Sequence, residues 1–346
     1  MLSKPKHILV IRLSAMGDVA MAVPVLRALV LQHPNVKITV VSRPFFYPFF
    51  DGIPNVNFFG VDLKERHKGF LGLLRLFSDL RNLNIDVVAD LHNVLRSKVV
   101  RALFVLSGKK VAATDKGRAE KKALTSLTNK VFAPVKSMVE RHVDTFKQLG
   151  FSIDLSNPLF PEKAILSEEI FSITGTKNQN WIGIAPFAQY ESKVYPIDLM
   201  QQVIDGLAEN KNQKILLFGG GEKEIQFLNQ LQNQHENVIV LAGKLKFKQE
   251  LEVISNLDIM LSMDSGNAHI AAMLGVKVIT LWGATHPFAG FKPFNQPDDF
   301  CLTSDREKYP LLPTSIYGNK KVEGYEGAMQ SILPTQVIEK INSNLT

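Results

Sequence analysis

The chain has 346 residues, too many for one ordinary hydrophobic core, and its length therefore predicts two domains. Hydrophobic residues make up 45% of it and charged residues 21%, a balance that excludes an intrinsically disordered protein. The single cysteine, Cys301, excludes a disulfide framework and favours a reducing cytoplasm, whereas the net charge of +7 fits either simple solubility or an anionic partner.

Predicted strands and helices alternate along the first half of the chain. The apolar run near the N-terminus continues into a polar loop without a small-residue cleavage site, so we interpret it as a strand and not as a signal peptide. No stretch approaches the roughly 18 apolar residues of a membrane span. The strands expected here are 7–13, 37–43, 55–60 and 86–91, and the expected helices are 19–33, 68–83, 94–106 and 139–149.

The segment 151–180 lacks sustained periodicity and ends in a polar stretch, which is typical of a domain linker. The alternation then restarts, with expected strands at 181–187, 214–220, 238–243, 258–264 and 277–283 and expected helices at 196–210, 222–233, 247–256, 266–274 and 335–344. This repetition predicts an α/β protein with two Rossmann-like, doubly wound domains facing a central cleft. We place the domains at 1–165 and 175–346, with the option that the last helix packs back on the N-terminal domain.

The first candidate site is the loop within ILVIRLSAMGDVAMAVPVL, residues 8–26. Gly17 permits a tight turn and close approach of a ligand. Asp18 falls beyond the carboxyl end of a strand, where ligands of open α/β sheets bind, but a role as helix N-cap explains it equally well. The loop matches neither the GxGxxG fingerprint nor a P-loop.

The second candidate site lies in IMLSMDSGNAHIAAMLGVKVITLWG, residues 259–283. A buried strand is expected to end at Asp264, and a helix begins at once with Ser265 and Gly266. Backbone N–H groups at such a helix start form an anion site that suits a diphosphate. His269 lies on an apolar helix face, where a packing role is a serious alternative to ligand binding.

Two further loops follow strands of the second half. Lys193 is the only cation in the loop of residues 184–196, and a lysine there can neutralise phosphate charge. On this loop alone, a solvated lysine is the better interpretation. Gly219 and Gly220 permit backbone approach to a ligand, and Glu222 either bonds a ribose or base or only complements the helix dipole.

Basic residues accumulate in the first half of the chain. Nine lysines and arginines occupy residues 96–122, against two acidic residues. No nucleic-acid motif accompanies them, so they predict contact with an acidic acceptor or with membrane headgroups, the alternative being a solvated face. The acceptor-binding candidates are Lys64, Arg66, Arg118 and Lys122.

Three segments in order resemble glycosyltransferase family 9, the ADP-heptose lipopolysaccharide heptosyltransferases. They are IRLSxxGD at 11–18, a lysine loop before an aromatic-Pro helix start at 189–196, and DSGxxHIAAxLGV followed by WGxT at 264–285. The resemblance covers essentially the whole chain. It implies a GT-B fold whose N-terminal domain binds the acceptor, with Ser14 and Gly17 among the contacts, and whose C-terminal domain binds the nucleotide-sugar.

The resemblance also implies inverting glycosyl transfer. Asp18 matches the proposed general base, Lys193 the phosphate-binding lysine and Glu222 the acidic residue that contacts the nucleoside. The signature around the diphosphate is matched by Asp264, Ser265, Gly266 and His269. We expect no metal, because no DxD-like carboxylate pair ends a strand, and no cofactor, because the ADP-sugar is a substrate.

The expected partners are a nucleotide-sugar donor, an anionic lipopolysaccharide-type acceptor and the peripheral surface of the inner membrane, with no nucleic acid. Two alternatives stay open. One is another GT-B enzyme, either an epimerase or a transferase that uses a different nucleotide-sugar. The other is a non-catalytic two-domain binding protein. The motifs leave open the sugar, the acceptor and the role of residues 286–330.

Overall fold

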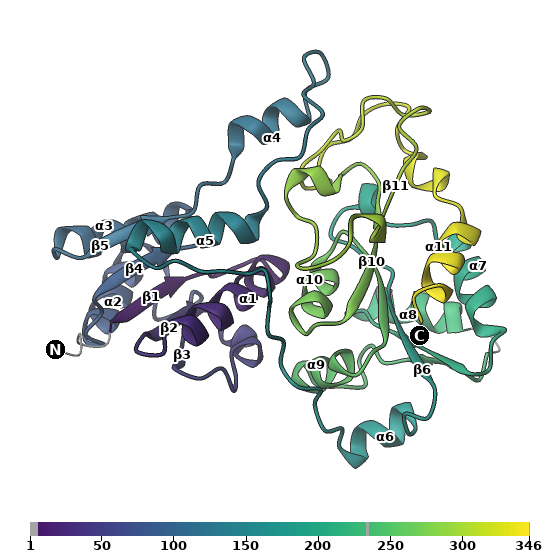
Figure 1. Ribbon diagram of the computed structural model, residues 1–346, viewed down its shortest axis with the longest axis horizontal. Helices are drawn as coiled ribbons and strands as arrows, with labels where there is room; N and C mark the ends of the chain where they lie inside the picture. The colour runs from purple at the N-terminus through teal and green to yellow at the C-terminus, as the bar shows by residue number, and fades with distance from the viewer. Residues whose placement is uncertain (1–5, 233–234, 346) are drawn as a thin grey trace. The chain divides into compact units, whose positions relative to one another are not determined.

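The computed structural model describes residues 6–232 and 235–345 (Figure 1). The chain forms two compact units, each with one parallel sheet: unit 1 is Met1–Lys116 with Lys136–Leu159, and unit 2 is Gly117–Val135 with Phe160–Thr346. Residues 1–5, which begin the N-terminal run, and residue 233, at the end of a predicted helix, lie outside the described residues.

Unit 1 contains a parallel sheet of order β3-β2-β1-β4-β5. Its strands are β1 (His7–Ile11), β2 (Lys37–Ser42), β3 (Val56–Gly60), β4 (Val87–Asp90) and β5 (Lys110–Ala113). Helix α1 packs with α5 and the 3-10 helix η1, whereas α2 packs with α3, as right-handed crossovers onto two faces require. These helices are α1 (Met16–Gln32), η1 (Pro44–Phe49), α2 (Gly69–Arg81), α3 (Leu95–Leu106) and α5 (Met138–Leu149).

Unit 2 contains a parallel sheet of order β11-β10-β9-β6-β7-β8, the strand order typical of Rossmann folds. Its strands are β6 (Asn180–Ala185), β7 (Gln213–Leu217), β8 (Val238–Val240), β9 (Ile259–Met263), β10 (Lys277–Trp282) and β11 (Cys301–Thr303). Helix α7 packs with α8 and α11, and α9 packs with α10. Their bounds are α7 (Ile197–Ala208), α8 (Glu222–Gln232), α9 (Phe247–Ser255), α10 (Gly266–Met273) and α11 (Pro334–Asn342).

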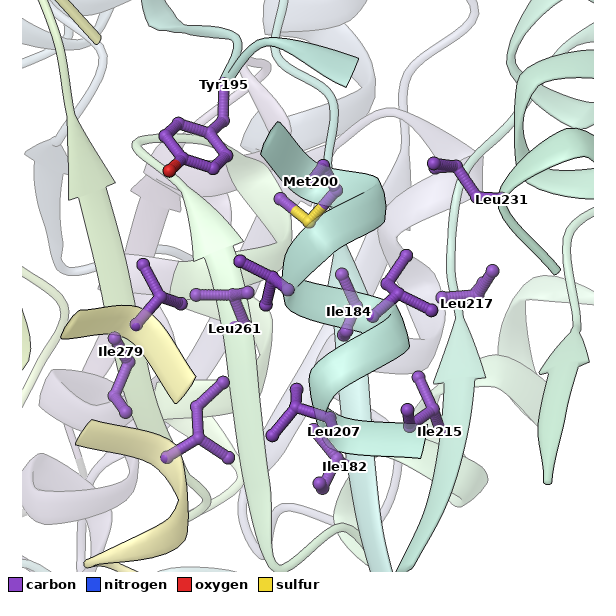
Figure 2. Packing of buried hydrophobic residues seen from close by; sticks show 14 of the residues in the cluster. Ile182, Ile184, Tyr195, Met200, Leu207, Ile215, Leu217, Leu231, Leu261 and Ile279 are labelled. Carbon is purple, nitrogen blue, oxygen red and sulfur yellow. The ribbon is translucent and has the colours of Figure 1, made fainter. Parts of the chain in front are cut away.

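The core of unit 2 lies between α7 and the sheet. Figure 2 shows Met200 and Leu207 of α7 over side chains of β6, β7 and β9, among them Ile184 and Leu261. These side chains are fully buried. Each such side chain contributes about 1.5–3 kcal/mol when removed from water, so the apolar strands hold the loops at their carboxyl ends in place.

Every predicted strand and helix has a counterpart, which confirms the α/β class, but two strands, two α-helices and the 3-10 helices of the described residues were not predicted. Strands β5 and β11 lie at sheet edges and have four and three residues, too few to show an alternation of apolar and polar side chains. Helix α6 (Glu168–Thr174) lies in the predicted linker and α4 (Arg118–Leu124) in the basic run. Both have seven residues, about two turns.

The compact units differ from the predicted domains in two places: residues 160–165 begin unit 2, and residues 117–135 cluster with unit 2 although the chain on either side belongs to unit 1. Aromatic contacts explain the second difference, because the Phe132 ring lies 5.0 Å from the ring of His286 and 4.8 Å from that of Phe288. The backbone N–H of Val135 also donates to the carbonyl of Phe288. The sequence left open that the last helix packs back on the N-terminal domain; α11 is part of unit 2, where it packs on α7.

Candidate functional site

Strand order determines which loops meet in each unit. In an open parallel sheet, the crevice forms where the order reverses, and ligands bind there, outside the carboxyl ends of the strands. In unit 1 this position lies between β1 and β4, and in unit 2 between β6 and β9. The predicted residues Asp18, Lys193 and Asp264 all follow one of these four strands.

An ion pair between a buried arginine and a partly exposed aspartate lies beyond the end of β1. An Nη2 atom of Arg12 lies 2.6 Å from Oδ2 of Asp18, with side-chain exposures of 4% and 28%. The same guanidinium donates through Nη1 to the carbonyl of Leu91, which follows β4. Arg12 thus joins the two strand ends and holds the carboxylate of Asp18 beside them.

Asp18 is not the N-cap of α1, and this alternative interpretation from the sequence is wrong. The helix begins at Met16, three residues earlier than predicted, so the cap position falls on Ala15 and Asp18 lies in the first turn. Its Oδ2 atom accepts a hydrogen bond from the backbone N–H of Ala15 at 3.2 Å. Gly17 precedes it in the same turn, and both residues are partly exposed.

Two buried histidines accompany this ion pair. Nε2 of His92, in the loop after β4, lies 3.4 Å from the hydroxyl of Ser14. Burial and the positive charge of Arg12 lower the pKa of His92 to about 4. Burial lowers the pKa of His142, on α5, to about 3. Both rings are therefore neutral at pH 7.

In unit 2, the loops after β6 and β9 meet in a second ion pair. Nζ of Lys193 lies 3.0 Å from Oδ2 of Asp264, with side-chain exposures of 13% and 7%. The interpretation of Lys193 as a solvated loop lysine is therefore wrong. Asp264 is held in turn by its backbone N–H, which donates to the carbonyl of Leu281.

The lysine loop rests on the segment 286–330, whose role the sequence left open. The hydroxyl of Ser192 donates to the carbonyl of Gly318 at 2.7 Å. A Cβ atom on Gly318 would lie 2.5 Å from Cδ of Lys193, so a glycine is needed for the lysine stem to pass. The residue also has φ +85°, where glycine is favoured.

The start of α10 offers backbone donors beside this pair. Ser265 is the N-cap, but its side chain caps no backbone N–H and lies 3.1 Å from the hydroxyl of Ser262. Gly266 begins the helix, and its first N–H groups have no partner within the helix. His269, in the first turn, is buried.

Two glycines of the loop after β7 differ in how much space surrounds them. A Cβ atom on Gly219 would lie 3.0 Å from Cδ1 of Leu228, whereas one on Gly220 would meet nothing within 4 Å. Gly220 therefore leaves open space for a ligand, whereas Gly219 does not. The carboxylate of Glu224 accepts a hydrogen bond from the backbone N–H of Gly220. Glu222 is the first residue of α8, and its side chain is exposed.

Comparison with known proteins shows the same family over most of the chain. The model of glycosyltransferase family 9 (heptosyltransferase) matches residues 73–317. The lipopolysaccharide core heptosyltransferase OpsX of Haemophilus influenzae is 24% identical over 301 residues, covering 85% of this chain and 84% of that protein.

This chain belongs to glycosyltransferase family 9.

Two solved structures share the fold of this family 9 glycosyltransferase. The family 9 protein from Veillonella parvula has a TM-score of 0.76 and 22% identity, covering 100% of this chain and 98% of that one. The E. coli heptosyltransferase WaaC, solved with ADP-2-deoxy-2-fluoro heptose, has a TM-score of 0.66 and 20% identity, covering 98% and 99%. The predicted GT-B fold class and transferase activity are confirmed.

The predicted acceptor-binding residues of this glycosyltransferase lie in two places. Lys64 and Arg66 follow β3 in unit 1, where Arg66 forms a bidentate pair with Asp79 at 2.8 and 3.0 Å. Arg118 and Lys122 are exposed one turn apart on α4, which belongs to unit 2.

Sequence reasoning missed Arg12, His92 and Gly318. The position of His92 directly after a predicted strand could have marked it as a candidate. The order of the strands, which brings it close to Ser14, could not be read from the sequence. Among residues 6–232 and 235–345, no group of three or more His, Cys, Asp or Glu side chains is placed to hold a metal ion. In the same residues, no helix is both long and apolar enough to span a membrane.

Proposed function

We propose that this family 9 glycosyltransferase moves a heptose, with inversion, from an ADP-sugar to an acceptor of the lipopolysaccharide core type. The observation that carries the proposal is that each switch point holds one largely buried ion pair, Arg12–Asp18 in unit 1 and Lys193–Asp264 in unit 2. The names of the relatives and the heptose analogue in the WaaC structure support the choice of donor and acceptor.

The carboxylate of Asp18 acts as the general base. It takes the proton from an acceptor hydroxyl while the oxygen of that hydroxyl attacks the anomeric carbon of the donor. Arg12 keeps the carboxylate in place, and Ser14 and Gly17 bind the acceptor beside it. A base of this kind contributes about 10²–10⁴-fold in rate.

The leaving group is stabilised in unit 2. As the bond between the anomeric carbon and the diphosphate breaks, negative charge grows on the diphosphate oxygens. The ammonium of Lys193, positioned by Asp264, and the N–H groups at the start of α10 are fixed donors for that charge. Ser265, Gly266 and His269 complete this diphosphate site. Glu222 and the open space at Gly220 suit the nucleoside.

Nucleotide calorimetry tests the donor assignment. We expect ADP to bind more tightly than UDP or GDP, and Lys193→Ala to weaken ADP binding by about tenfold, since one charge-assisted contact is lost. The matched control is Lys177→Ala, which removes a lysine paired with Asp258 at the amino end of β9. A preference for UDP or GDP would point to a different nucleotide-sugar. We expect no metal or cofactor, so turnover should be unchanged by EDTA.

We further propose that unit 1 docks on the anionic cytoplasmic surface of the inner membrane. Exposed apolar side chains occur in the segments that follow strands β2, β3 and β4, and exposed basic side chains occur in the same segments. The apolar side chains are Phe45, Tyr47, Phe70, Leu71 and Leu95, and the basic ones are Arg43, Lys64, Lys68, Arg96 and Lys98. Apolar insertion combined with basic contacts to anionic lipid is a recognised mode of peripheral binding.

Vesicle co-sedimentation tests this docking. The double variant Phe70→Ser/Leu71→Ser should lose binding to vesicles that contain phosphatidylglycerol. The control is Leu106→Ser, which removes an equally exposed apolar side chain at the opposite end of α3. Equal loss in both variants, or binding to pure phosphatidylcholine vesicles alone, would contradict the proposal.

A further inference from the structure

Hydrogen bonds to consecutive residues hold the loop after β4 in place, although no sequence motif marks this loop. The buried carboxylate of Asp90 accepts hydrogen bonds from the backbone N–H groups of His92 and Asn93 at 3.0 and 2.8 Å. Asn93 has φ 45°, a left-handed conformation that costs a non-glycine residue free energy. The carbonyl of Leu91 accepts a hydrogen bond from Arg12. A loop constrained in this way places the His92 ring in a defined position.

The ring of His92 is directed at the acceptor side of the candidate site. The residue is only 9% exposed, its Nε2 atom contacts the hydroxyl of Ser14, and Nδ1 has no hydrogen-bond partner among the described residues. The ring also interacts electrostatically with Asp18. A serine hydroxyl has one donor and two acceptor positions, so a contact with the ring restricts where the remaining positions point.

We propose that His92 is a positioning residue for the acceptor. Its neutral ring orients the Ser14 hydroxyl, which then binds the acceptor beside the carboxylate of Asp18. The inference rests on the proposed function, because it takes the loop of Ser14 and Asp18 as the acceptor site. The fold supplies the contact, since β1 and β4 are neighbours and their loops emerge side by side at the switch point.

Substitutions at position 92 test the proposal by steady-state kinetics with ADP-heptose and a heptose-deficient lipopolysaccharide core. His92→Ala and His92→Asn should raise the acceptor KM about 3–10-fold, the effect of one neutral hydrogen bond, and leave the donor KM unchanged. His92→Gln should stay within about twofold of the original, because the longer amide reaches the position of Nε2. Asn reaches only the position of Nδ1.

A double-mutant cycle separates positioning from a structural role. Ser14→Ala should raise the acceptor KM as His92→Ala does, and His92→Ala should add nothing further in the Ser14→Ala background. The matched control is His7→Ala, which removes a histidine–hydroxyl contact of 2.8 Å to Thr39 at the opposite end of β1. It should lower the melting temperature and leave the acceptor KM unchanged.

Three results would overturn the inference: additive effects of the two alanine variants, impairment of His92→Gln equal to that of His92→Ala, or a matching rise in the donor KM. Failure of the proposed function is distinguishable from these. It would appear as normal turnover of Asp18→Asn, measured separately.

Discussion

At the scale of single residues, Asp18 carries the sharpest prediction. The sequence alternative of an N-cap implied that Asn would be tolerated. The structure implies a cost of about 1–3 kcal/mol for Asp18→Asn, because Arg12 stays buried without a negative partner. We also expect kcat to fall at least about 10²-fold through loss of the base, with donor affinity unchanged. Thermal melts and turnover check both.

The control for this prediction is Asp79→Asn, which breaks the pair with Arg66 elsewhere in unit 1. The Arg66 guanidinium holds the pKa of the Asp79 carboxyl below its usual value, so some stability should be lost while kcat is retained. Turnover of Asp18→Asn close to that of the original protein would remove Asp18 from the mechanism.

Gly318 offers a second test at this scale. In Gly318→Ala, the new methyl group would overlap the stem of Lys193, so we expect the ammonium to be displaced and ADP affinity to fall by about tenfold. Gly324→Ala is the matched control: it has a similar φ of +79° but nothing within 4 Å of the added Cβ. Both variants should lose about 1–3 kcal/mol of stability from backbone strain. Equal ADP affinities, measured by calorimetry, would show that the contact with Lys193 is unimportant.

At the scale of elements, the C-terminal part of the segment 117–135 should depend on the aromatic side chain of Phe132 for its attachment to the rest of unit 2. The ring of Phe132 contacts those of His286 and Phe288, and Cζ of Arg306 lies 3.4 Å from its centre. Phe132→Ala should therefore speed amide hydrogen exchange around residue 132, because this aromatic contact is lost there, while Lys121 still contacts the ring of Phe291 at the other end of the segment. Leu127→Ala, an exposed position in the same segment, should not. Unchanged exchange in Phe132→Ala would contradict this account.

At the scale of the whole molecule, buried neutral histidines should make stability sensitive to acid. Burial lowers the folded-state pKa of His142 to about 3, whereas a solvated histidine in the unfolded chain has a pKa of about 6.5. As the pH falls below about 6.5, the unfolded state binds a proton that the folded state does not, so stability falls by about 1.4 kcal/mol per pH unit. His92 and His286, each with a pKa of about 4, act in the same direction down to that value.

Glu250 opposes this trend, because burial raises its pKa to about 7 and its folded form gains a proton first. Three histidines outweigh one carboxyl between about pH 4.5 and 6, so denaturant unfolding should show a net loss of stability on acidification. His142→Leu should reduce that pH dependence. A slope identical to that of the original protein would show that His142 is not buried in the neutral form.

The sequence by itself determined the α/β class, the strands of both sheet interiors and the loops that carry Asp18, Lys193 and Asp264. These follow from local periodicity and from residues at strand ends, which each segment encodes alone. Strand order was decided only by the tertiary structure, because pairing between β1 and β4 joins residues 79 positions apart, as Ile8 and Val87 are. Strand order brings His92 to Ser14 and Lys193 to Asp264, whereas the aromatic contacts of Phe132 place 117–135 with unit 2. Their partners are distant in the chain, so no periodicity or spacing could reveal them.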